Sequence, residues 1–232
     1  MAPMTDFETI LAEARARAGG AAALERRLPV AKSPDELRNL GDDRYLSLMS
    51  LRVFRAGLRH GMVDAKWPAF EAAFHGFQPR RIQAMNDEDM DVLLGDRRLI
   101  RHGGKLRSVR DNAAAIALLA RETGGLGAYL ADWPGSRIVE LWADLAKRFK
   151  QMGGNSGPYF LRMAGKDTFL LTGDVVRALN RWGAVEGTPK GKAARRLVQE
   201  AFNRWAEESG RPLCQLSMIS GPLGGVIPTC SE

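Results

Sequence analysis

The chain has 232 residues, a formal net charge of +7 and a hydrophobic share of 45%. This length suits one large domain or two closely packed lobes, and the apolar share is enough to form a core. The positive charge favours a polyanionic partner, most simply nucleic acid, although many small basic proteins bind none. The sequence has no uninterrupted apolar run long enough to cross a bilayer, so we expect no membrane association.

The cysteines and histidines do not form a metal-binding pattern. Cys214 and Cys230 are sixteen residues apart, and the three histidines are not clustered. A structural zinc site needs about four Cys or His ligands and an iron–sulfur cluster four thiolates, so we expect no metal and no cofactor. The N-terminus carries acids where a signal peptide would be positive. We therefore expect a cytoplasmic protein of bacterial type, with reduced thiols and with DNA binding that places it at the nucleoid.

Helical periodicity runs through almost the whole chain, in short segments with recognisable starts. Thr5 and Glu8 form a capping-box pattern, and Ser33 precedes a proline and two acids. The expected helices cover residues 9–18, 21–27, 34 onward, 45–58, 67–74, 79–82, 87 onward, 108–121, 136–149, 158–163, 174–181 and 192–208. No stretch alternates like a strand. The sequence therefore predicts an all-α fold, a two-lobed helical bundle in a single domain over residues 1–232.

Two loops and the C-terminus interrupt this helical pattern. Residues 124–135 and 183–191 are rich in glycine, and we expect them to mark the boundary between the lobes, which we expect to meet at a cleft. The tail from about residue 220 is rich in glycine and proline, so we expect it to be loose.

A glycine-rich hairpin at about residues 145–165 is the most informative feature of the chain. Gly153, Gly154 and Gly157 separate two expected helices. Glycines let a backbone approach a ligand closely, and amides at a helix start attract an anion. Basic residues flank the hairpin, and a carboxylate, Asp174, begins a later helix. The flanking residues are Lys147, Arg148, Lys150, Lys166 and Arg177. This pattern is typical of a helix-hairpin-helix DNA-binding motif followed by a catalytic aspartate.

Short motifs between Leu48 and Leu119 keep one order and spacing for about seventy residues. They are Ala56-Gly57-Leu58, Phe70-Glu71-Ala72-Ala73-Phe74, Phe77-Gln78-Pro79, Met85-Asn86-Asp87-Glu88-Asp89, Leu99-Ile100-Arg101-His102, Gly104-Lys105 and Asn112-Ala113. This segment resembles the DNA-3-methyladenine glycosylase I family of the helix-hairpin-helix DNA glycosylase superfamily. The later residues Phe149-Lys150, Gly153, Phe160 and Gly165 resemble the hairpin of the same family. The resemblance implies the fold of that superfamily and a DNA glycosylase activity.

Two positions and one metal site differ from what that family shows. Arg52 stands where the family has a Glu that hydrogen-bonds the flipped base, and His60 stands where it has a stacking Trp. The family's Cys/His zinc clasp has no counterpart. A cationic Arg52 repels a cationic methylated purine, so we expect a neutral or electron-rich base. The resemblance places Tyr45, Phe54 and Tyr159 in the base pocket with Arg52 and His60, although the alternative for Tyr159 is a core aromatic.

The segment from Gly165 to Arg181 resembles the catalytic segment of the endonuclease III and adenine-mismatch glycosylase branch. The catalytic Asp of that branch corresponds to Thr172 here, and the carboxylate of this chain comes two residues later, at Asp174. We expect Asp174 to be catalytic. Two alternatives are that Asp174 only caps its helix, and that Asp167 is the active carboxylate. Bifunctional relatives carry a lysine where this chain has Tyr159, so we expect no lyase activity.

The DNA-binding surface is expected to include the hairpin and a second basic turn. The hairpin contributes Lys150, Gly153, Gly154, Gly157 and Lys166. Arg101 and Lys105 flank Gly103-Gly104 and could hold the opposite strand, or they could belong to a solvated loop between helices. Such basic residues neutralise phosphates, which makes DNA affinity fall with salt.

Three functions compete for this sequence. The favoured one is a monofunctional DNA glycosylase of base excision repair, a monomer that flips an alkylated or deaminated purine out of double-stranded DNA and hydrolyses its N-glycosidic bond. The second is a helix-hairpin-helix DNA-binding protein that has lost this chemistry, which the substitutions at Arg52 and His60 would suit. The third is a helical adaptor in which the hairpin is only a tight turn.

Overall fold

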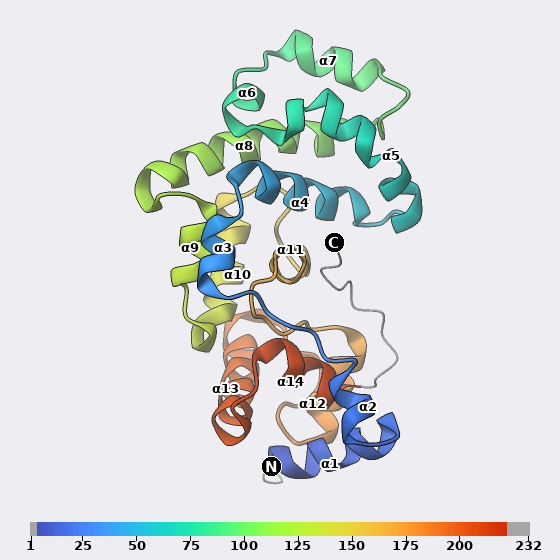
Figure 1. Ribbon diagram of the computed structural model, residues 1–232, viewed down its shortest axis with the longest axis vertical. Coiled ribbons are helices and arrows are strands. Elements are labelled where there is room, and N and C mark those ends of the chain that lie inside the picture. Colours follow the sequence, from blue (N-terminus) through green and yellow to red (C-terminus); the bar gives the residue numbers. More distant parts are fainter. Residues whose placement is uncertain (1–3, 222–232) are drawn as a thin grey trace. The chain divides into compact units, whose positions relative to one another are not determined.

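The structure is a computed structural model that describes residues 4–221. Every regular element within those residues is helical, so the all-α prediction is confirmed (Figure 1). The helices are α1 (Phe7–Ala18), α2 (Ala21–Glu25), α3 (Pro34–Asn39), α4 (Asp42–Arg55), α5 (His60–Ala73), α6 (Pro79–Gln83), α7 (Asp87–Gly95), α8 (Gly103–Thr123), α9 (Leu126–Asp132), α10 (Ile138–Arg148), α11 (Ser156–Ala164), α12 (Gly173–Arg181), α13 (Gly191–Ser209) and α14 (Leu213–Ser220), with short 3₁₀ turns η1 (His75–Phe77) and η2 (Gly135–Arg137). None of these helices is both long and apolar enough to cross a membrane. Cys230 and nearly all of the expected loose tail lie outside the described residues.

The chain divides into two compact units. Unit 1 comprises Met1–Lys32, Pro134–Leu141 and Leu161–Glu232, and unit 2 comprises Ser33–Trp133 and Trp142–Phe160. One boundary falls inside the expected loop at residues 124–135. The other expected boundary, residues 183–191, lies within unit 1.

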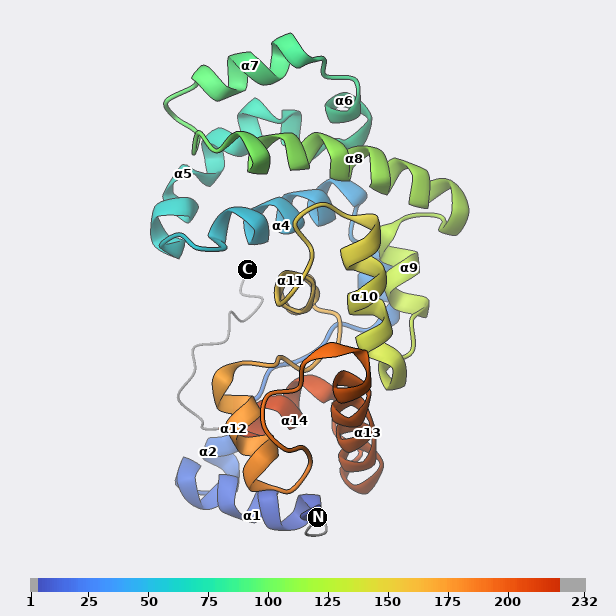
Figure 2. The same cartoon turned by 180° about the vertical axis from the view of Figure 1, so that it is seen from behind.

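Unit 2 is built around the long helix α8. This helix packs against α4, α6, α7 and α9, and Figures 1 and 2 show it running alongside α4. Its apolar residues recur every three or four positions, which places them on one face of a helix. The buried apolar positions are Leu106, Val109, Ala113, Ile116 and Leu119. The helix begins at Gly103, five residues earlier than expected, because the side chain of His102 accepts a hydrogen bond from the Lys105 amide and caps it.

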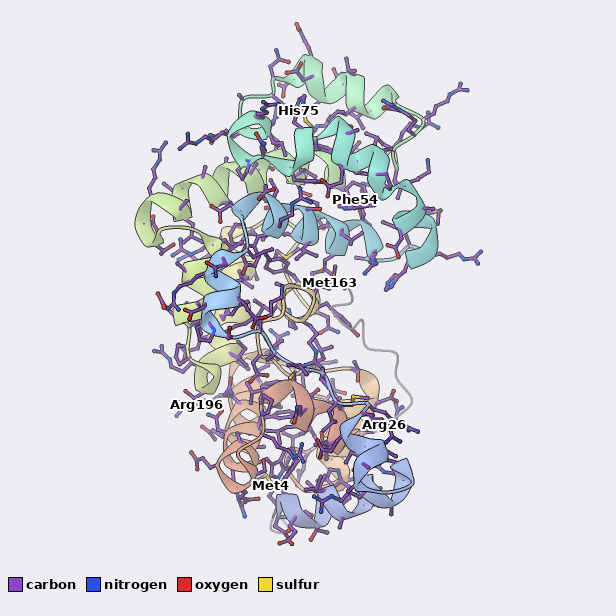
Figure 3. The ribbon with its side chains drawn as sticks, viewed as in Figure 1. Met4, Arg26, Phe54, His75, Met163 and Arg196 are labelled. Carbon is purple, nitrogen blue, oxygen red and sulfur yellow. The ribbon has the colours of Figure 1, made fainter. Side chains whose placement is uncertain are left out.

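An aromatic cluster fills the space between α4, α5 and η1. Phe54 projects from α4 (Figure 3), and its ring centroid lies 4.6 Å from that of Phe70 on α5. Trp67 stacks on both Phe70 and Phe77, at 4.9 and 5.4 Å between centroids. Aromatic rings bury large apolar areas and add specific edge and stacking contacts. The helix α5 that carries Trp67 and Phe70 begins at His60, seven residues before the segment 67–74 that periodicity predicts.

Helix α9 occupies a segment that the sequence suggested was a loop, so that expectation is wrong. Gly127 is buried, and a Cβ added there would collide with the carbonyl oxygen of Leu37 and lie 3.2 Å from Cε2 of Tyr45. The Tyr45 hydroxyl donates to the same Leu37 oxygen at 2.7 Å. Gly127 therefore allows α9 to pack closely on α3 and does not break the helix.

Unit 1 has a second core, formed by α1, α12, α13 and α14. Its largest fully buried side chains are Phe7, Phe169, Phe202 and Trp205, and the rings of Phe169 and Phe202 stack at 4.1 Å between centroids. Helix α14 was not expected from the sequence. Its buried positions, which include Leu213, Leu216 and Ile219, complete this core.

The hydrogen bonds at the starts of α1 and α3 show which of the expected capping residues is present. Ser33 and Glu36 form a complete capping box at α3, as expected. At α1 the expected Thr5 cap is wrong, because the side chain of Asp6 accepts the hydrogen bond from the Thr9 amide at 2.8 Å. An Asp at this position bonds the free amides of the first turn more strongly than a Thr does.

Candidate active site and DNA-binding hairpin

The turn between α10 and α11 is a tight backbone structure made possible by its glycines. Gln151 and Gly154 adopt left-handed conformations, with φ of 65° and 60°. The amide of Gly157 donates to the carbonyl of Met152 at 3.2 Å, and a Cβ on Gly157 would lie 3.1 Å from the same oxygen. Gly157 therefore closes the turn by close approach, while nothing lies within 4 Å of a Cβ built on Gly154.

Several amides at the start of α11 point to a site for an anion. The N–H groups of Gly153, Gly154 and Asn155 make no hydrogen bond to any residue that the structure describes. Gly153, Gly154 and Asn155 are all exposed. Free amides and the positive end of a helix dipole together attract phosphate. Lys150, also exposed, adds a positive charge next to them.

Asn112 on α8 holds the first residue of this turn, a role that sequence reasoning missed. Its Oδ1 accepts from the Lys150 amide at 2.7 Å, and its Nδ2 donates to the Lys150 carbonyl at 3.1 Å. The side chain of Asn112 is almost fully buried, at 1% exposure. The available signal was a polar residue on the apolar face of α8, since buried polar groups need hydrogen-bond partners.

Arg52 and Tyr159 form a pair within unit 2. The guanidinium carbon of Arg52, on α4, lies over the Tyr159 ring at 4.7 Å from its centroid. Both residues are partly exposed. Burial lowers the pKa of Arg52, and the Tyr159 hydroxyl offsets part of this effect. The structure thus brings together two of the five expected pocket residues, a cation and an aromatic face.

The other three expected pocket residues lie in different surroundings. Tyr45 and Phe54 are fully buried. Tyr45 packs edge-on against Phe160 and bonds to Leu37, and Phe54 belongs to the aromatic cluster of α4 and α5. His60 is exposed at the first residue of α5. Two of these rings therefore serve the core as the structure stands, and they support the helices that carry Arg52 and Tyr159.

Lys105 and Arg101, expected together on the DNA surface, have different environments. The Lys105 ammonium donates to the carbonyls of Ala56 and Phe54, at 2.6 and 3.4 Å, and so satisfies the C-terminus of α4. Burial and the nearby Arg52 lower the pKa of Lys105. Arg101 is exposed. Of these two cations, only Arg101 has a charged group that makes no such bond to the backbone of a residue that the structure describes.

This difference leads to a prediction for the two cations. Arg101→Met should weaken DNA binding uniformly and reduce the salt dependence by about one phosphate contact. Lys105→Met should instead lower the free energy of unfolding by about 1 kcal/mol, because two carbonyls of α4 lose their donor. Fluorescence anisotropy across a salt series and thermal unfolding measure the two effects. A steeper loss of affinity for Lys105→Met than for Arg101→Met would contradict this assignment.

Asp174 lies in the first turn of α12, within unit 1. Thr172 caps this helix, since its Oγ1 accepts from the Val175 amide at 3.2 Å. The Asp174 carboxylate pairs with Arg177 on the next turn and is 44% exposed. Capping alone therefore does not account for Asp174, because Thr172 performs that task. The carboxylate remains accessible to a ligand from solvent.

Asp167, the alternative carboxylate, is committed to the fold of unit 1. Its two oxygens accept from the amides of Leu213 and Cys214, at 2.9 and 2.8 Å, at the start of α14. Lys166 beside it is buried, at 7% exposure. Gly165, φ 90°, is also buried, and a Cβ there would lie 2.6 Å from Cγ and Cδ of Lys32. This end of the expected hairpin is therefore packed into unit 1.

The side chains of residues 4–221 offer no metal-binding cluster. No group of three or more His, Cys, Asp or Glu side chains in that range is arranged to hold a metal ion. Cys214 is buried, and burial together with Asp167 raises the pKa of its thiol to about 12. A thiol with so high a pKa is a poor nucleophile at neutral pH.

Comparison with known proteins gives one family. Residues 37–153, just over half of the chain, match the family described as methyladenine glycosylase. DNA-3-methyladenine glycosylase 1 of Escherichia coli (strain K12) is 35% identical over 72 residues, which are 31% of this chain and 38% of that protein. The chain thus spans well under half the length of this curated relative.

Solved structures of DNA glycosylases are similar to the chain at low identity. The 3-methyladenine DNA glycosylase I from Staphylococcus aureus is 22% identical, covering 62% of this chain and 84% of its own, with a TM-score of 0.49. The 8-oxoguanine DNA glycosylase of Methanocaldococcus jannaschii is 13% identical, covering 92% of both chains, with a TM-score of 0.49.

Proposed function

This chain belongs to the methyladenine glycosylase family, and we propose that it is a monofunctional DNA glycosylase of base excision repair. It flips an alkylated or deaminated purine out of double-stranded DNA and hydrolyses the N-glycosidic bond. The observation that carries this proposal is the family match itself, which covers the helices from α4 to α10 and reaches into the glycine turn. The matched residues include Arg52 and also Asn112, the clamp that holds the backbone of Lys150.

The glycine turn supplies the contact with DNA in this proposal. The free amides of Gly153 and Gly154 bind a backbone phosphate, and Lys150 adds charge. Asn112 holds the turn rigidly through the Lys150 backbone, so that little ordering is needed when DNA binds. Such phosphate contacts place the duplex without reading its sequence.

Asp174 supplies the chemistry in this proposal. Cleavage of the bond between C1′ and the base leaves positive charge on the sugar, and a nearby carboxylate stabilises that charge. A water molecule then adds its oxygen to C1′. The departing base keeps the bonding electrons and takes up a proton, while the water loses one. Asp174 is suited to orient this water because its carboxylate is partly exposed and Thr172 already caps the helix.

The reaction ends at base removal in this proposal. Strand cleavage by a glycosylase requires an amine that attacks C1′, and the corresponding position here is Tyr159. A phenol cannot form the imine intermediate. Trapping of a covalent complex with DNA by borohydride would contradict this part of the proposal.

Base release from modified duplexes tests the whole proposal. Duplex oligonucleotides that each contain one of 7-methylguanine, hypoxanthine, uracil or 8-oxoguanine, and chemically methylated DNA for 3-methyladenine, are incubated with the full chain. Release is read as alkali-sensitive sites or as free base. Release of at least one base by the wild type is the expected result. Salt-sensitive DNA binding without release from any duplex would point to a DNA-binding protein without this chemistry.

A further inference from the structure

Arg52 has an unsatisfied hydrogen-bond donor in a partly buried position. Its Nε atom is buried and has no hydrogen-bond partner among residues 4–221. A buried donor without an acceptor is unfavourable, so such an atom in a folded protein calls for an explanation. The guanidinium carbon lies over the Tyr159 ring at 4.7 Å from its centroid, so a cationic group faces an aromatic ring here. Because Nε itself is buried, acceptor atoms of a ligand would reach the guanidinium through its two Nη groups.

The surroundings of Arg52 are positively charged. The charge of Arg55 lowers the pKa of Arg52, and the charge of Arg52 lowers the pKa of Lys105. Asp64 pairs with Arg55, and no ion pair joins Arg52 to a carboxylate in the described part of the chain. A ligand that binds here must therefore bring electron-rich atoms, and a positively charged base is repelled.

Resting on the proposed function, we infer that Arg52 reads the O6 and N7 acceptors of a flipped, deaminated purine, with hypoxanthine as the preferred base. A guanidinium donates two parallel hydrogen bonds, and the O6/N7 edge of a purine is the best-known base partner for it. Hypoxanthine is neutral and presents both acceptors. A purine that accepts both hydrogen bonds lies in the plane of the guanidinium that donates them.

The same contact rejects the other common purines. Adenine places its N6 amino donor where hypoxanthine has O6, so two donors would face each other. 7-Methylguanine has lost the N7 acceptor and carries a positive charge. Normal guanine keeps the acceptor edge, but it is paired with cytosine, and flipping a well-paired base costs more than flipping one from a mismatch. Hypoxanthine opposite thymine is such a mismatch. Edge recognition excludes adenine, and base pairing protects guanine.

The test compares two identical substitutions on α4. Arg52→Lys keeps the charge and removes the planar fork, and Arg55→Lys does the same three residues along, where the side chain pairs with Asp64. Single-turnover release is measured from a duplex with hypoxanthine opposite thymine, from one with 7-methylguanine, and from methylated DNA. We expect wild-type release of hypoxanthine to exceed that of the methylated bases. Arg52→Lys should slow it about tenfold to a hundredfold, and Arg55→Lys should leave it within about twofold.

Binding provides a second readout that does not depend on hydrolysis. Fluorescence anisotropy compares a duplex with hypoxanthine opposite thymine with its adenine–thymine counterpart, and we expect a preference of about tenfold that Arg52→Lys removes. Faster release of the methylated bases than of hypoxanthine would overturn this inference and leave the proposed glycosylase standing. If no base is released but binding still shows a preference for hypoxanthine that depends on Arg52, the proposed hydrolysis is wrong and base recognition by Arg52 stands. Absence of both would overturn the inference.

Discussion

Asp174→Asn should reduce base release by at least about 100-fold, because an amide cannot stabilise the positive charge that develops on the sugar. The loss should appear in the single-turnover rate and leave DNA affinity nearly unchanged. The fold should not suffer, since Thr172 caps α12 and the Asp174 side chain is 44% exposed. Its ion pair with Arg177 is exposed as well, so we expect the free energy of unfolding to fall by less than about 1 kcal/mol.

Asp167→Asn is the matched control for this prediction, because it makes the same chemical change in the same unit. Asp167 bonds two amides at the start of α14, and an asparagine can accept only one of these bonds with its single oxygen. We expect a loss of about 1–2 kcal/mol in unfolding free energy and a nearly normal rate for the folded fraction. If the Asp167 variant is stable and inactive while the Asp174 variant is active, Asp167 would be the catalytic carboxylate and Asp174 would not.

The fold was largely predictable because helical periodicity is a local property of the chain. The spacing of apolar residues in α4 and α8 and the capping box at Ser33 all depend on neighbours within a few positions. Local patterns did not predict helix α9. A glycine such as Gly127 favours a loop by residue type, but in the structure it lets α9 pack on the Leu37 carbonyl of α3. That contact joins residues ninety positions apart, and no window of sequence contains it.

The candidate site was predictable by residue type and less so by environment. The family resemblance gave Arg52 and Tyr159 as pocket residues, and that role stays a prediction. The contact between the Arg52 guanidinium and the Tyr159 ring became visible only with the two helices in place. Lys105 shows the limit of this reasoning. A lysine next to glycines suggests a phosphate contact, whereas its ammonium satisfies the end of α4. Which direction a long side chain takes depends on unpaired backbone carbonyls nearby in space, and spacing along the chain does not reveal them.

Asn112→Ala should loosen the glycine turn and thereby weaken both the fold and DNA binding. Asn112 makes two hydrogen bonds to the backbone of Lys150, in opposite directions, and is buried. Alanine removes both and leaves the Lys150 groups without their partner. We expect a loss of about 2–3 kcal/mol in unfolding free energy, which corresponds to a fall of roughly 5–10 °C in Tm for a chain of this size.

The effect on DNA follows from the loss of a preformed turn. The free amides of Gly153 and Gly154 bind phosphate well only when the turn that carries them is already ordered. We therefore expect DNA affinity to fall about tenfold, and amide hydrogen exchange to accelerate at residues 149–155 more than elsewhere in unit 2. Asp111→Ala, an exposed neighbour on the same helix, serves as the control and should change neither. Unchanged exchange in the turn of the Asn112 variant would show that the glycines hold their conformation without this clamp. The turn would then owe its shape to its own backbone hydrogen bonds, from the Gly157 amide to Met152 and from the Ser156 amide to Gly153.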